Sequence, residues 1–394
     1  MLRDWEGMGS VSSTVRNVCF VTGTRAEFGL MRSTLRAIQQ ERNLNLQIVA
    51  TGMHLDAAHG DGIQSIKDDG WKIDAVIPWD ANSGRDRKTT ARNTGLAAAA
   101  LADALAELQT DVVLVVGDRV EAFAAASAAH LSGLIVAHVH GGDRAAGQVD
   151  DCLRHAISKL AHIHFPATAQ SARRLRKMGE DRWRIHRAGS PGLDGIVADA
   201  SPWARIQEAV GELHPRKYAL LVLHPVDADD VAEEHRARLV LDAAAAVPYE
   251  RIVIVYPNND PGAAGIIRYW DALSDPRFIA RRDLPRAIYL GLLREAAVLL
   301  GNSSSGIIEA ASFGTPVIDI GPRQKGRERS RNVTHLPYDP QRITAELMRK
   351  WNAGHPQRVR SGNIYGRGGT GQIIARVLAN LAPSKRLLNK LISY

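Results

Sequence analysis

Acidic residues and histidines gather after two apolar runs in the first half of the chain. Asp118 follows the first run, and His140 and Asp143 follow the second. Asp150 comes shortly afterwards, where a helical pattern begins. General acid–base catalysis is usually carried out by such groups at strand ends that border a cleft. Each residue alone also fits an ordinary role, such as a turn or a helix cap, but the whole cluster favours catalysis.

The same cluster raises the alternative of a metal site. His138 and His140 are separated by one residue of a strand pattern, so strand alternation places both on one face. Together with Asp143 and Asp150 they have the side-chain types that bind zinc or manganese. Such pairs are also common in strands without metals, and we expect no catalytic metal.

A serine-rich turn in the second half of the chain is typical of an anion-binding site. It reads Gly301-Asn302-Ser303-Ser304-Ser305-Gly306, follows an apolar run and opens a helical pattern. Hydroxyls, a permissive glycine and free backbone N–H groups suit a pyrophosphate. Glu309, one helical turn further on, has a carboxylate that can accept both hydroxyls of a ribose. The alternative is a serine-rich helix cap with a first-turn acid.

Other polar segments also follow apolar runs. Arg25 stands in the turn Thr22-Gly23-Thr24-Arg25 and has a fork of donors for phosphate. His224 and the segment 257–262 follow two runs of the second half and are expected to line the same cleft. Arg323 lies in the cationic loop 321–329, which can bind the anionic nucleotide. For each segment a turn, a surface arginine or a solvated charge run is the alternative. The first turn is not GxGxxG, so it does not support a dinucleotide site.

Short buried strands alternate with helical patterns through nearly the whole chain. In the first half we predict strands at Val18–Val21, Leu46–Ala50, Asp111–Val116 and Leu134–His138, with helices at Phe28–Gln40, Thr94–Leu108 and Val120–Leu131. After a stretch rich in Pro, Gly, Asp and Ser at 190–203, strands recur at Tyr218–Leu223, Arg251–Tyr256, Ala297–Leu300 and Pro316–Ile320. Helices at Asp229–Ala246, Ala263–Leu273, Leu284–Glu295, Ile307–Phe313, Thr344–Trp351 and Gly371–Leu381 complete the second half.

This alternation predicts an α/β protein with two doubly wound domains of parallel strands that face a central cleft. A chain of 394 residues is long enough for two domains of ordinary size. With 45% apolar and 23% charged residues it resembles neither a disordered protein nor a membrane bundle. Two cysteines exclude a disulfide framework, and residues 1–17 have no secretory apolar region. We therefore expect a cytoplasmic protein that does not bind membranes.

The formal charge of +8 raises the alternative of a nucleic-acid-binding protein. The strongest basic segment is Arg173-Arg174-Leu175-Arg176-Lys177. Only 5% of the residues are aromatic, which leaves few side chains for base stacking. The charge surplus fits an anionic small molecule equally well, and we expect no nucleic-acid partner.

Several of these segments together resemble the UDP-N-acetylglucosamine 2-epimerase family, and more closely its hydrolysing branch. The resemblance extends from Val21 to about Leu381, and its blocks include Val21–Glu27, Gly117–Arg119, Arg154–Lys159, Pro257–Gly262, Gly301–Gly306 and Arg323–Arg327. It implies the GT-B fold, with a Rossmann-like N-terminal domain at 1–195 that holds the catalytic acids. A Rossmann-like nucleotide-binding domain at 196–368 and a C-terminal helix at 369–394, which packs back on the first domain, are also implied.

The resemblance also implies a reaction and its residues. A nucleotide sugar, UDP-linked or GDP-linked, would lose its nucleotide diphosphate by anti elimination across C1 and C2, and water would add to the resulting glycal. Asp118 and Asp150 match carboxylates implicated in this chemistry, and His224 matches a histidine beside the diphosphate. Residues 303–306 and Arg25 would bind the diphosphate, and Glu309 would bind the ribose. No cofactor is implied, and a homodimer or homotetramer is expected.

Three positions differ from the pattern of many relatives. A glutamate is common where this chain has His140, and a glutamate stands at the position of Asp143 in relatives associated with a di-N-acetylated bacillosamine nucleotide. Either His140 transfers a proton or Asp143 reaches into the site. An acid is common at the position of Arg367, so the nucleotide preference stays open. A non-hydrolysing 2-epimerase and a GT-B glycosyltransferase are the alternatives.

Overall fold

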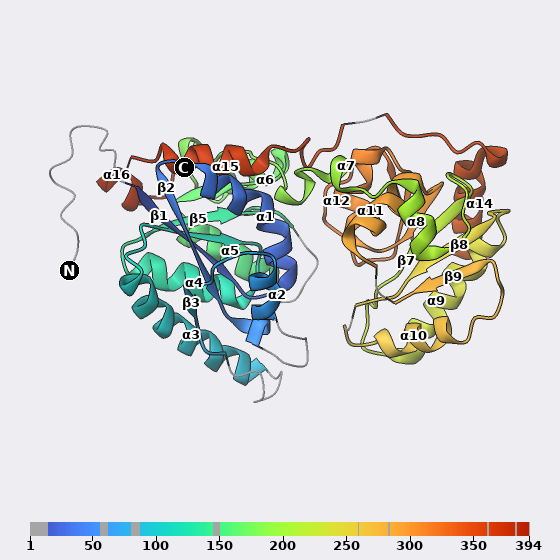
Figure 1. Ribbon diagram of the computed structural model, residues 1–394, viewed down its shortest axis with the longest axis horizontal. Helices are drawn as coiled ribbons and strands as arrows, with labels where there is room; N and C mark the ends of the chain where they lie inside the picture. The colour runs from blue at the N-terminus through green and yellow to red at the C-terminus, as the bar shows by residue number, and fades with distance from the viewer. Residues whose placement is uncertain are drawn as a thin grey trace. The chain divides into compact units, whose positions relative to one another are not determined.

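The structure is a computed structural model, which describes residues 15–55, 62–79, 87–144, 150–258, 260–282, 284–360, 362–382 and 384–393 (Figure 1). The chain forms two compact units. Unit 1 contains the described residues up to Asp194 and those from Gly368 onward, and unit 2 extends from Gly195 to Arg367. The chain therefore leaves unit 1 once and returns to it for its last segment.

Unit 1 is built on a parallel sheet with the strand order β3-β2-β1-β4-β5-β6. Its strands are β1 (Arg16–Thr22), β2 (Leu44–Ala50), β3 (Ala75–Val76), β4 (Val112–Val116), β5 (Ile135–Val139) and β6 (Ile163–Phe165). The four strands that the apolar runs predict are confirmed. The sequence analysis missed β3 and β6 because runs of two and three residues are too short for a periodic pattern.

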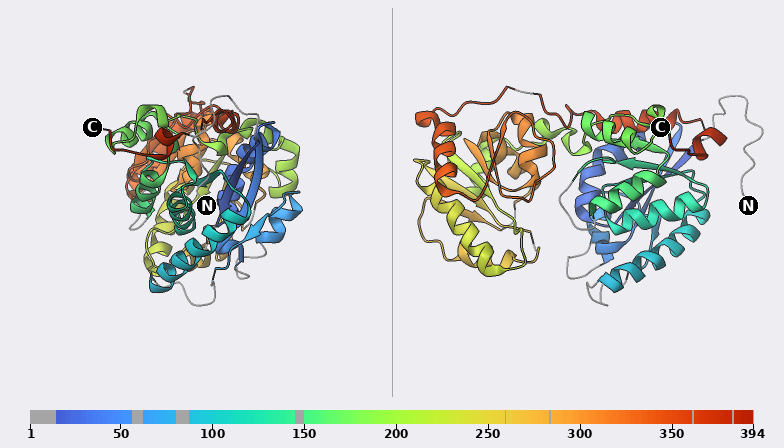
Figure 2. Two further views of the ribbon diagram at one scale, coloured as in Figure 1. Left: turned by 90° about the vertical axis from the view of Figure 1, so that its left-hand side faces the viewer. Right: turned by 180° about the vertical axis from the view of Figure 1, so that it is seen from behind.

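Helices cover both faces of this sheet (Figures 1 and 2). They are α1 (Arg25–Gln40), α2 (Gly62–Asp68), α3 (Arg87–Glu107), α4 (Val120–Leu131), α5 (Asp150–Leu160), α6 (Ala169–Lys177), α15 (Thr370–Ala379) and α16 (Lys385–Leu388). Strand alternation divides the apolar core between the two faces. Leu114 of β4 packs in a cluster with α1 and α15, whereas the next residue, Val115, packs in a cluster with α3 and α4.

The C-terminal helix α15 belongs to unit 1 and lies beside α1 (Figure 1). Asp194 accepts hydrogen bonds from the backbone N–H groups of Thr370 and Gly371, at 2.8 and 2.7 Å. A Cβ atom at Gly371 would lie 2.7 Å from the carbonyl oxygen of Ser33 in α1. Glycine at this position therefore allows the two helices to approach closely.

Unit 2 repeats the architecture with the strand order β12-β11-β10-β7-β8-β9, again all parallel. Its strands are β7 (Tyr218–Val222), β8 (Arg251–Val255), β9 (Phe278–Arg281), β10 (Val298–Gly301), β11 (Val317–Ile320) and β12 (Val333–Leu336). Its helices are α7 (Ile196–Asp199), α8 (Trp203–Val210), α9 (Asp230–Ala245), α10 (Ala263–Asp271), α11 (Arg286–Glu295), α12 (Ser304–Ile308), α13 (Ala310–Phe313) and α14 (Pro340–Trp351). The single helix predicted at Ile307–Phe313 is wrong, because α12 ends at Ile308 and α13 starts at Ala310.

In both sheets the strand that comes first in the sequence lies at the centre of the strand order. In unit 1 β1 pairs with β2 on one side and β4 on the other, and in unit 2 β7 pairs with β8 and β10. The loops after these central pairs diverge at the carboxyl edge, which is where open α/β sheets bind ligands. Among the helices of the described ranges, none combines the length and the apolar character that crossing a membrane requires.

The C-terminal tail caps α5 with a buried lysine. The Lys390 ammonium donates to the carbonyl oxygens of Ser158, Lys159 and Ala161 at 3.1, 2.8 and 2.8 Å. It also pairs with the fully buried Glu180 carboxylate at 2.6 Å. Burial lowers the pKa of Lys390 to about 8. One cation thus caps the end of α5 and pairs with a buried acid, which Lys159 and His164 also contact.

Lys390→Met is expected to destabilise the protein by about 3 kcal/mol, because it leaves a buried carboxylate and helix-end carbonyls without this donor. The free energy of unfolding from denaturant titration measures the change. Lys177→Met, at an exposed lysine in the last turn of α6, is the control and is expected to change it by less than about 0.5 kcal/mol. Equal stability of the two variants would contradict the capping role.

Candidate functional site

Asp118 lies at the carboxyl edge of the unit 1 sheet, directly after β4 and Gly117. Its Oδ2 accepts a hydrogen bond from the guanidinium of Arg154, in α5. The side chain of Arg154 is buried, and that of Asp118 is 24% exposed. The carboxylate is therefore held by a buried cation and keeps access to solvent. Asp150 is the first residue of α5, and its side chain lies outside the described part of the structure.

His140 and Asp143 form a hydrogen-bonded pair in the loop after β5. Nδ1 of His140 lies 2.8 Å from Oδ2 of Asp143, and its Nε2 lies 3.1 Å from the hydroxyl of Ser190. The other oxygen of Asp143 accepts a hydrogen bond of 2.6 Å from Ser171. Two of the three residues that differ from the family pattern are therefore in contact, because the short Asp143 side chain reaches the imidazole of His140 and orients it.

His138 has a different environment from His140. It is fully buried in β5, with Nε2 2.8 Å from the carbonyl oxygen of Gly117 and Nδ1 3.1 Å from the hydroxyl of Ser158. Burial lowers its pKa to about 3, so the imidazole is neutral near pH 7.

The prediction that His138 and His140 share a strand face is wrong. The strand ends at Val139, and His140 has a φ of 64°, which breaks the alternation. Both nitrogens of each ring already lie within hydrogen-bond distance of a protein atom. Within the described ranges, no three His, Cys, Asp or Glu side chains are arranged to hold a metal ion.

A second group of ionisable residues at this edge was missed by the sequence analysis. Glu27 of α1 accepts hydrogen bonds from the backbone N–H groups of Gly23 and Thr24, at 2.8 and 3.1 Å. Burial and the nearby Glu121 raise the pKa of Glu27 to about 7. The capping-box pattern of Thr24 and Glu27 was a readable signal for this contact.

A buried histidine and an exposed arginine lie beside the turn at 22–24 that Glu27 caps. Nε2 of His54 lies 3.1 Å from the hydroxyl of Thr22, and burial lowers the pKa of His54 to about 4. Arg25, the first residue of α1, is exposed, and its charge also disfavours protonation of His54. The exposed guanidinium is therefore available to an anionic ligand.

In unit 2, His224 and Asn302 connect the two central strands at the carboxyl edge. The side-chain oxygen of Asn302 accepts from the backbone N–H of His224 at 2.8 Å, and its amide donates to the carbonyl oxygen of His224 at 2.8 Å. Asn302 is fully buried. Burial and Arg323 lower the pKa of His224 to about 4, so its imidazole is neutral near pH 7.

The serine-rich turn opens α12, as its pattern predicts. Ser303 is the N-cap, and its hydroxyl lies 2.9 Å from that of Ser305. The hydroxyl of Tyr289 also hydrogen-bonds Ser305. Ser303, Ser304 and Ser305 are half-buried. Hydroxyls at the carboxyl edge of the sheet can therefore donate to an anion.

The two glycines of this turn are required by packing. Gly301 has a φ of 133°, and a Cβ atom there would lie 2.0 Å from the carbonyl oxygen of Val222. A Cβ atom at Gly306 would lie 2.9 Å from a methyl group of Val317 in β11. The first glycine lets β10 turn against β7, and the second lets α12 pack on the sheet.

Glu309 and Arg323, both predicted to bind the nucleotide, already have partners in the protein. Glu309 is 13% exposed and forms an ion pair of 2.7 Å with Arg286. Arg323 lies 3.3 Å from Asp260, which also accepts a hydrogen bond of 2.7 Å from the Asn258 side chain. Asn258 in turn contacts Nδ1 of His224, so Arg323 joins a polar chain at this edge.

Arg367 is exposed and is the last residue of unit 2. The preceding segment is well anchored, since the Tyr365 hydroxyl donates to the carbonyl oxygen of Glu328 at 3.0 Å. The Asn363 amide donates to the carbonyl oxygen of Ile308 in α12 at 2.6 Å. The segment that carries Arg367 is therefore fixed to the helix that follows the serine-rich turn.

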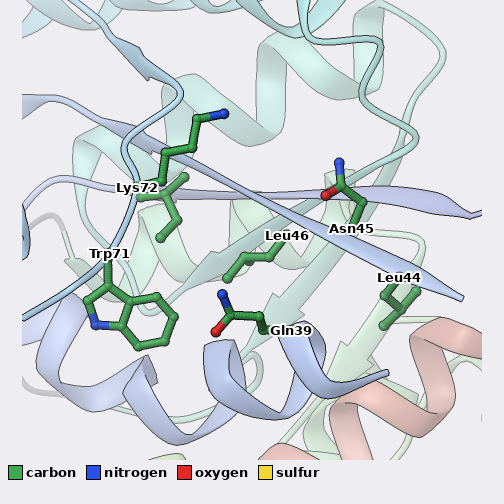
Figure 3. Close-up of a pocket in the computed structure, with 7 residues that line it drawn as sticks. Gln39, Leu44, Asn45, Leu46, Trp71 and Lys72 are labelled. Atoms are coloured by element: carbon green, nitrogen blue, oxygen red, sulfur yellow. The ribbon is translucent and has the colours of Figure 1, made fainter. Parts of the chain in front are cut away.

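A separate pocket lies between α1 and β2 (Figure 3). Its lining residues are Gln39, Leu44, Asn45, Leu46, Ile48, Trp71 and Lys72. Three of the four lining strand residues, Leu44 to Leu46, belong to the amino-terminal part of β2, whereas the groups described above follow the carboxyl ends of strands. This pocket is therefore not part of the candidate site.

Known proteins resemble this chain over most of its length. It is 36% identical over 384 residues to UDP-N,N'-diacetylbacillosamine 2-epimerase (hydrolyzing) of Legionella pneumophila, covering 96% of this chain and 100% of the relative. It is 30% identical over 323 residues to GDP/UDP-N,N'-diacetylbacillosamine 2-epimerase (hydrolyzing) of Campylobacter jejuni, covering 81% of this chain and 83% of the relative.

Solved structures share the fold. UDP-GlcNAc 2-epimerase from Neisseria meningitidis, solved with UDP-GlcNAc, superimposes with a TM-score of 0.76 at 19% identity and covers 92% of this chain and 99% of that structure. Unit 1 and unit 2 thus form the two Rossmann-like halves of the GT-B fold that the sequence predicts. The family model described as UDP-N-acetylglucosamine 2-epimerase matches residues 36–379. With this match and these relatives, the chain belongs to the UDP-N-acetylglucosamine 2-epimerase family.

Proposed function

We propose that this chain is a hydrolysing nucleotide-sugar 2-epimerase. Its substrate is a UDP- or GDP-linked 2-acetamido sugar, such as UDP-di-N-acetylbacillosamine, and its products are the nucleotide diphosphate and the free 2-epimeric sugar. The observation that carries this proposal is the edge of unit 1, where Asp118 and the His140–Asp143 pair follow neighbouring strands. The two relatives with hydrolysing activity in their names support it.

The residues of unit 2 bind the nucleotide diphosphate in this proposal. The hydroxyls of Ser303, Ser304 and Ser305 donate to phosphate oxygens and stabilise the charge that develops on the leaving group. Arg323 adds a cation. A contact of Arg25 with the diphosphate stays a prediction of the family resemblance. His224, which is neutral near pH 7, interacts as a hydrogen-bonding group and not as a fixed charge. Glu309 binds the ribose after exchanging its contact with Arg286.

In this proposal, side chains at the carboxyl edge of the unit 1 sheet remove the C2 proton of the substrate and return a proton to C2. The C2–H bond and the C1–O bond to the diphosphate break, the C1–C2 double bond forms, and a protein base takes the C2 proton. Water then adds its hydroxyl to C1, and a proton is returned to C2 from the opposite face. Asp118, Asp150 and His140 are the candidate proton carriers, with Asp143 orienting the imidazole of His140.

Departure of the diphosphate precedes full proton removal, because the C2 proton is not acidic and positive charge must build at C1 first. The partly exposed Asp118 suits this step, since the buried Arg154 holds and orients its carboxylate. The reaction consumes only water besides the nucleotide sugar and includes no redox step. The family resemblance also predicts a homodimer or homotetramer and a place in nonulosonic acid synthesis.

Incubation in D₂O with UDP-N-acetylglucosamine, UDP-di-N-acetylbacillosamine or the GDP analogue is expected to yield a free manno-configured sugar with deuterium at C2. Proton NMR measures the loss of the C2 signal and the release of nucleotide diphosphate. Retained nucleotide with deuterium at C2 would instead indicate a non-hydrolysing epimerase. No turnover of any of the three without an acceptor, followed by turnover with one, would indicate a glycosyltransferase.

Asp118→Asn is expected to lower kcat by about 10²–10⁴-fold, because it removes a candidate acid–base group. Affinity for UDP, measured by calorimetry, is expected to stay within about threefold. Asp103→Asn, at an exposed acid of α3, is the matched control and is expected to keep full activity. Full activity of Asp118→Asn would exclude this carboxylate from the chemistry.

A further inference from the structure

Ser190 contacts His140 at the ring nitrogen that Asp143 does not contact. Its hydroxyl oxygen lies 3.1 Å from Nε2 of His140, although the two residues are 50 positions apart in the sequence, and Ser190 is fully buried. The segment that leads to Ser190 starts beside the edge strand β6, where Ile185 forms a parallel bridge with His164. This arrangement brings Ser190 to the carboxyl edge of the unit 1 sheet, next to the loop after β5.

The backbone of Ser190 is held by a turn and by the C-terminal helix. Its carbonyl oxygen accepts a hydrogen bond of 3.1 Å from the backbone N–H of Leu193, in the short 3₁₀ helix that starts at Pro191. The same oxygen accepts one of 3.3 Å from the hydroxyl of Thr370, the first residue of α15. Since a single torsion separates the serine backbone from the hydroxyl oxygen, a fixed backbone gives that oxygen a defined place.

His140 has a strained backbone that directs its ring toward these partners. Its φ of 64° lies in the left-handed region, which residues other than glycine seldom occupy. Its backbone N–H donates to the carbonyl oxygen of Phe165, in β6, at 3.1 Å. Strain of this kind persists where surrounding contacts over-determine the conformation, and it is common at functional sites. The contacts of the His140 ring are therefore part of what holds this loop.

Asp143, the partner at Nδ1, is anchored to α6. Its Oδ1 accepts a hydrogen bond of 2.6 Å from Ser171, whose hydroxyl also lies 2.9 Å from that of Thr168, the N-cap of α6. The guanidinium of Arg174, in the same helix, donates to the carbonyl oxygen of Gly142. The carboxylate that contacts Nδ1 is therefore fixed to a helix.

The two partners of the imidazole have different tasks. An ionised carboxylate only accepts hydrogen bonds, so Asp143 selects the tautomer of His140 with the proton on Nδ1. Nε2 of the neutral ring then has a lone pair, which accepts from the Ser190 hydroxyl. A ring held at one nitrogen can swing about that contact, whereas hydrogen bonds at both nitrogens fix its plane. The same hydroxyl can accept from Nε2–H of a protonated ring, so it suits a histidine that carries a proton.

We propose that Ser190 is a positioning residue for the proton-transfer step, which holds the His140 ring in its orientation by donating to Nε2 in the tautomer that Asp143 selects. Packing alone does not account for a serine here, because burying a hydroxyl is costly unless it has a partner. This inference rests on the proposed function, in which His140 is a candidate proton carrier. It gives a role to a residue of the polar stretch 190–203, which the sequence analysis did not assign to the site.

NMR of protein labelled with ¹⁵N-histidine tests the contact directly. The ring signals of His140 are identified as those lost in His140→Gln. In the wild type we expect the neutral ring to carry its proton on Nδ1, and in Ser190→Ala we expect the Nε2 signal to move while Nδ1 stays protonated. A proton on Nε2 in the wild type, or an Nε2 signal that is unchanged in Ser190→Ala, would overturn the proposal.

Ser190→Ala is expected to lower the single-turnover rate by about tenfold and to change KM by less than about threefold, because the ring acts in the chemical step and not in ground-state binding. Ser158→Ala is the matched control, since the Ser158 hydroxyl is also buried and lies 3.1 Å from Nδ1 of His138, which has no role in the proposed reaction. The control is expected to change the rate by less than about twofold. Equal rates for the two variants would overturn the proposal.

His140→Gln completes a double-mutant cycle with Ser190→Ala. Because Ser190 is proposed to act through His140, adding Ser190→Ala to His140→Gln is expected to change the rate by less than about twofold. A further loss of about tenfold in the double variant would mean that Ser190 acts by another route, and it would overturn the proposal.

The NMR spectrum separates this inference from the proposed function. If the wild-type protein converts no nucleotide sugar, the proposed function fails, and the Nε2 signal still decides whether Ser190 holds the ring. If Ser190→Ala does not fold, the wild-type spectrum decides, because a proton on Nε2 would overturn the proposal and a proton on Nδ1 would support it.

Discussion

The central strand pair of each parallel sheet is the constraint on which the candidate site depends. Where β1 lies between β2 and β4, and β7 between β8 and β10, the loops at the carboxyl edge diverge to opposite faces. Polar side chains can then occupy this edge without competing with crossover helices. His224 and Asn302 follow the two central strands of unit 2 and are joined by two hydrogen bonds of 2.8 Å, so the edge is fixed by buried polar contacts.

Each of these acids at the carboxyl edge of unit 1 pairs with a specific basic side chain. Asp118 pairs with Arg154, Asp143 with His140, and Glu121 with Arg119. Such pairs contribute little net stability once the cost of burial is counted, but they orient the groups. Orientation is what proton transfer requires, because the reacting atoms must lie within hydrogen-bond reach of their partners.

The C-terminal segment stabilises elements of unit 1 that hold candidate site residues. Lys390 caps the carboxyl end of α5, and the same helix provides Arg154 to Asp118 near its other end. The hydroxyl of Thr370, the first residue of α15, donates to the carbonyl oxygen of Ser190, whose own hydroxyl contacts His140. The return of the chain to unit 1 therefore stabilises elements that hold two of the candidate catalytic residues.

The sequence by itself determined the layered architecture and the family, because strand and helix periodicity and several short motifs are local properties. It also located Asp118, Asn302 and the serine-rich turn, since polar residues after apolar runs mark the carboxyl edge of a parallel sheet. The left-handed backbone of His140 and the burial of Glu121 between two glycines were decided by the tertiary structure alone. Both depend on atoms that are distant in sequence, and no local pattern encodes which loop a side chain will meet.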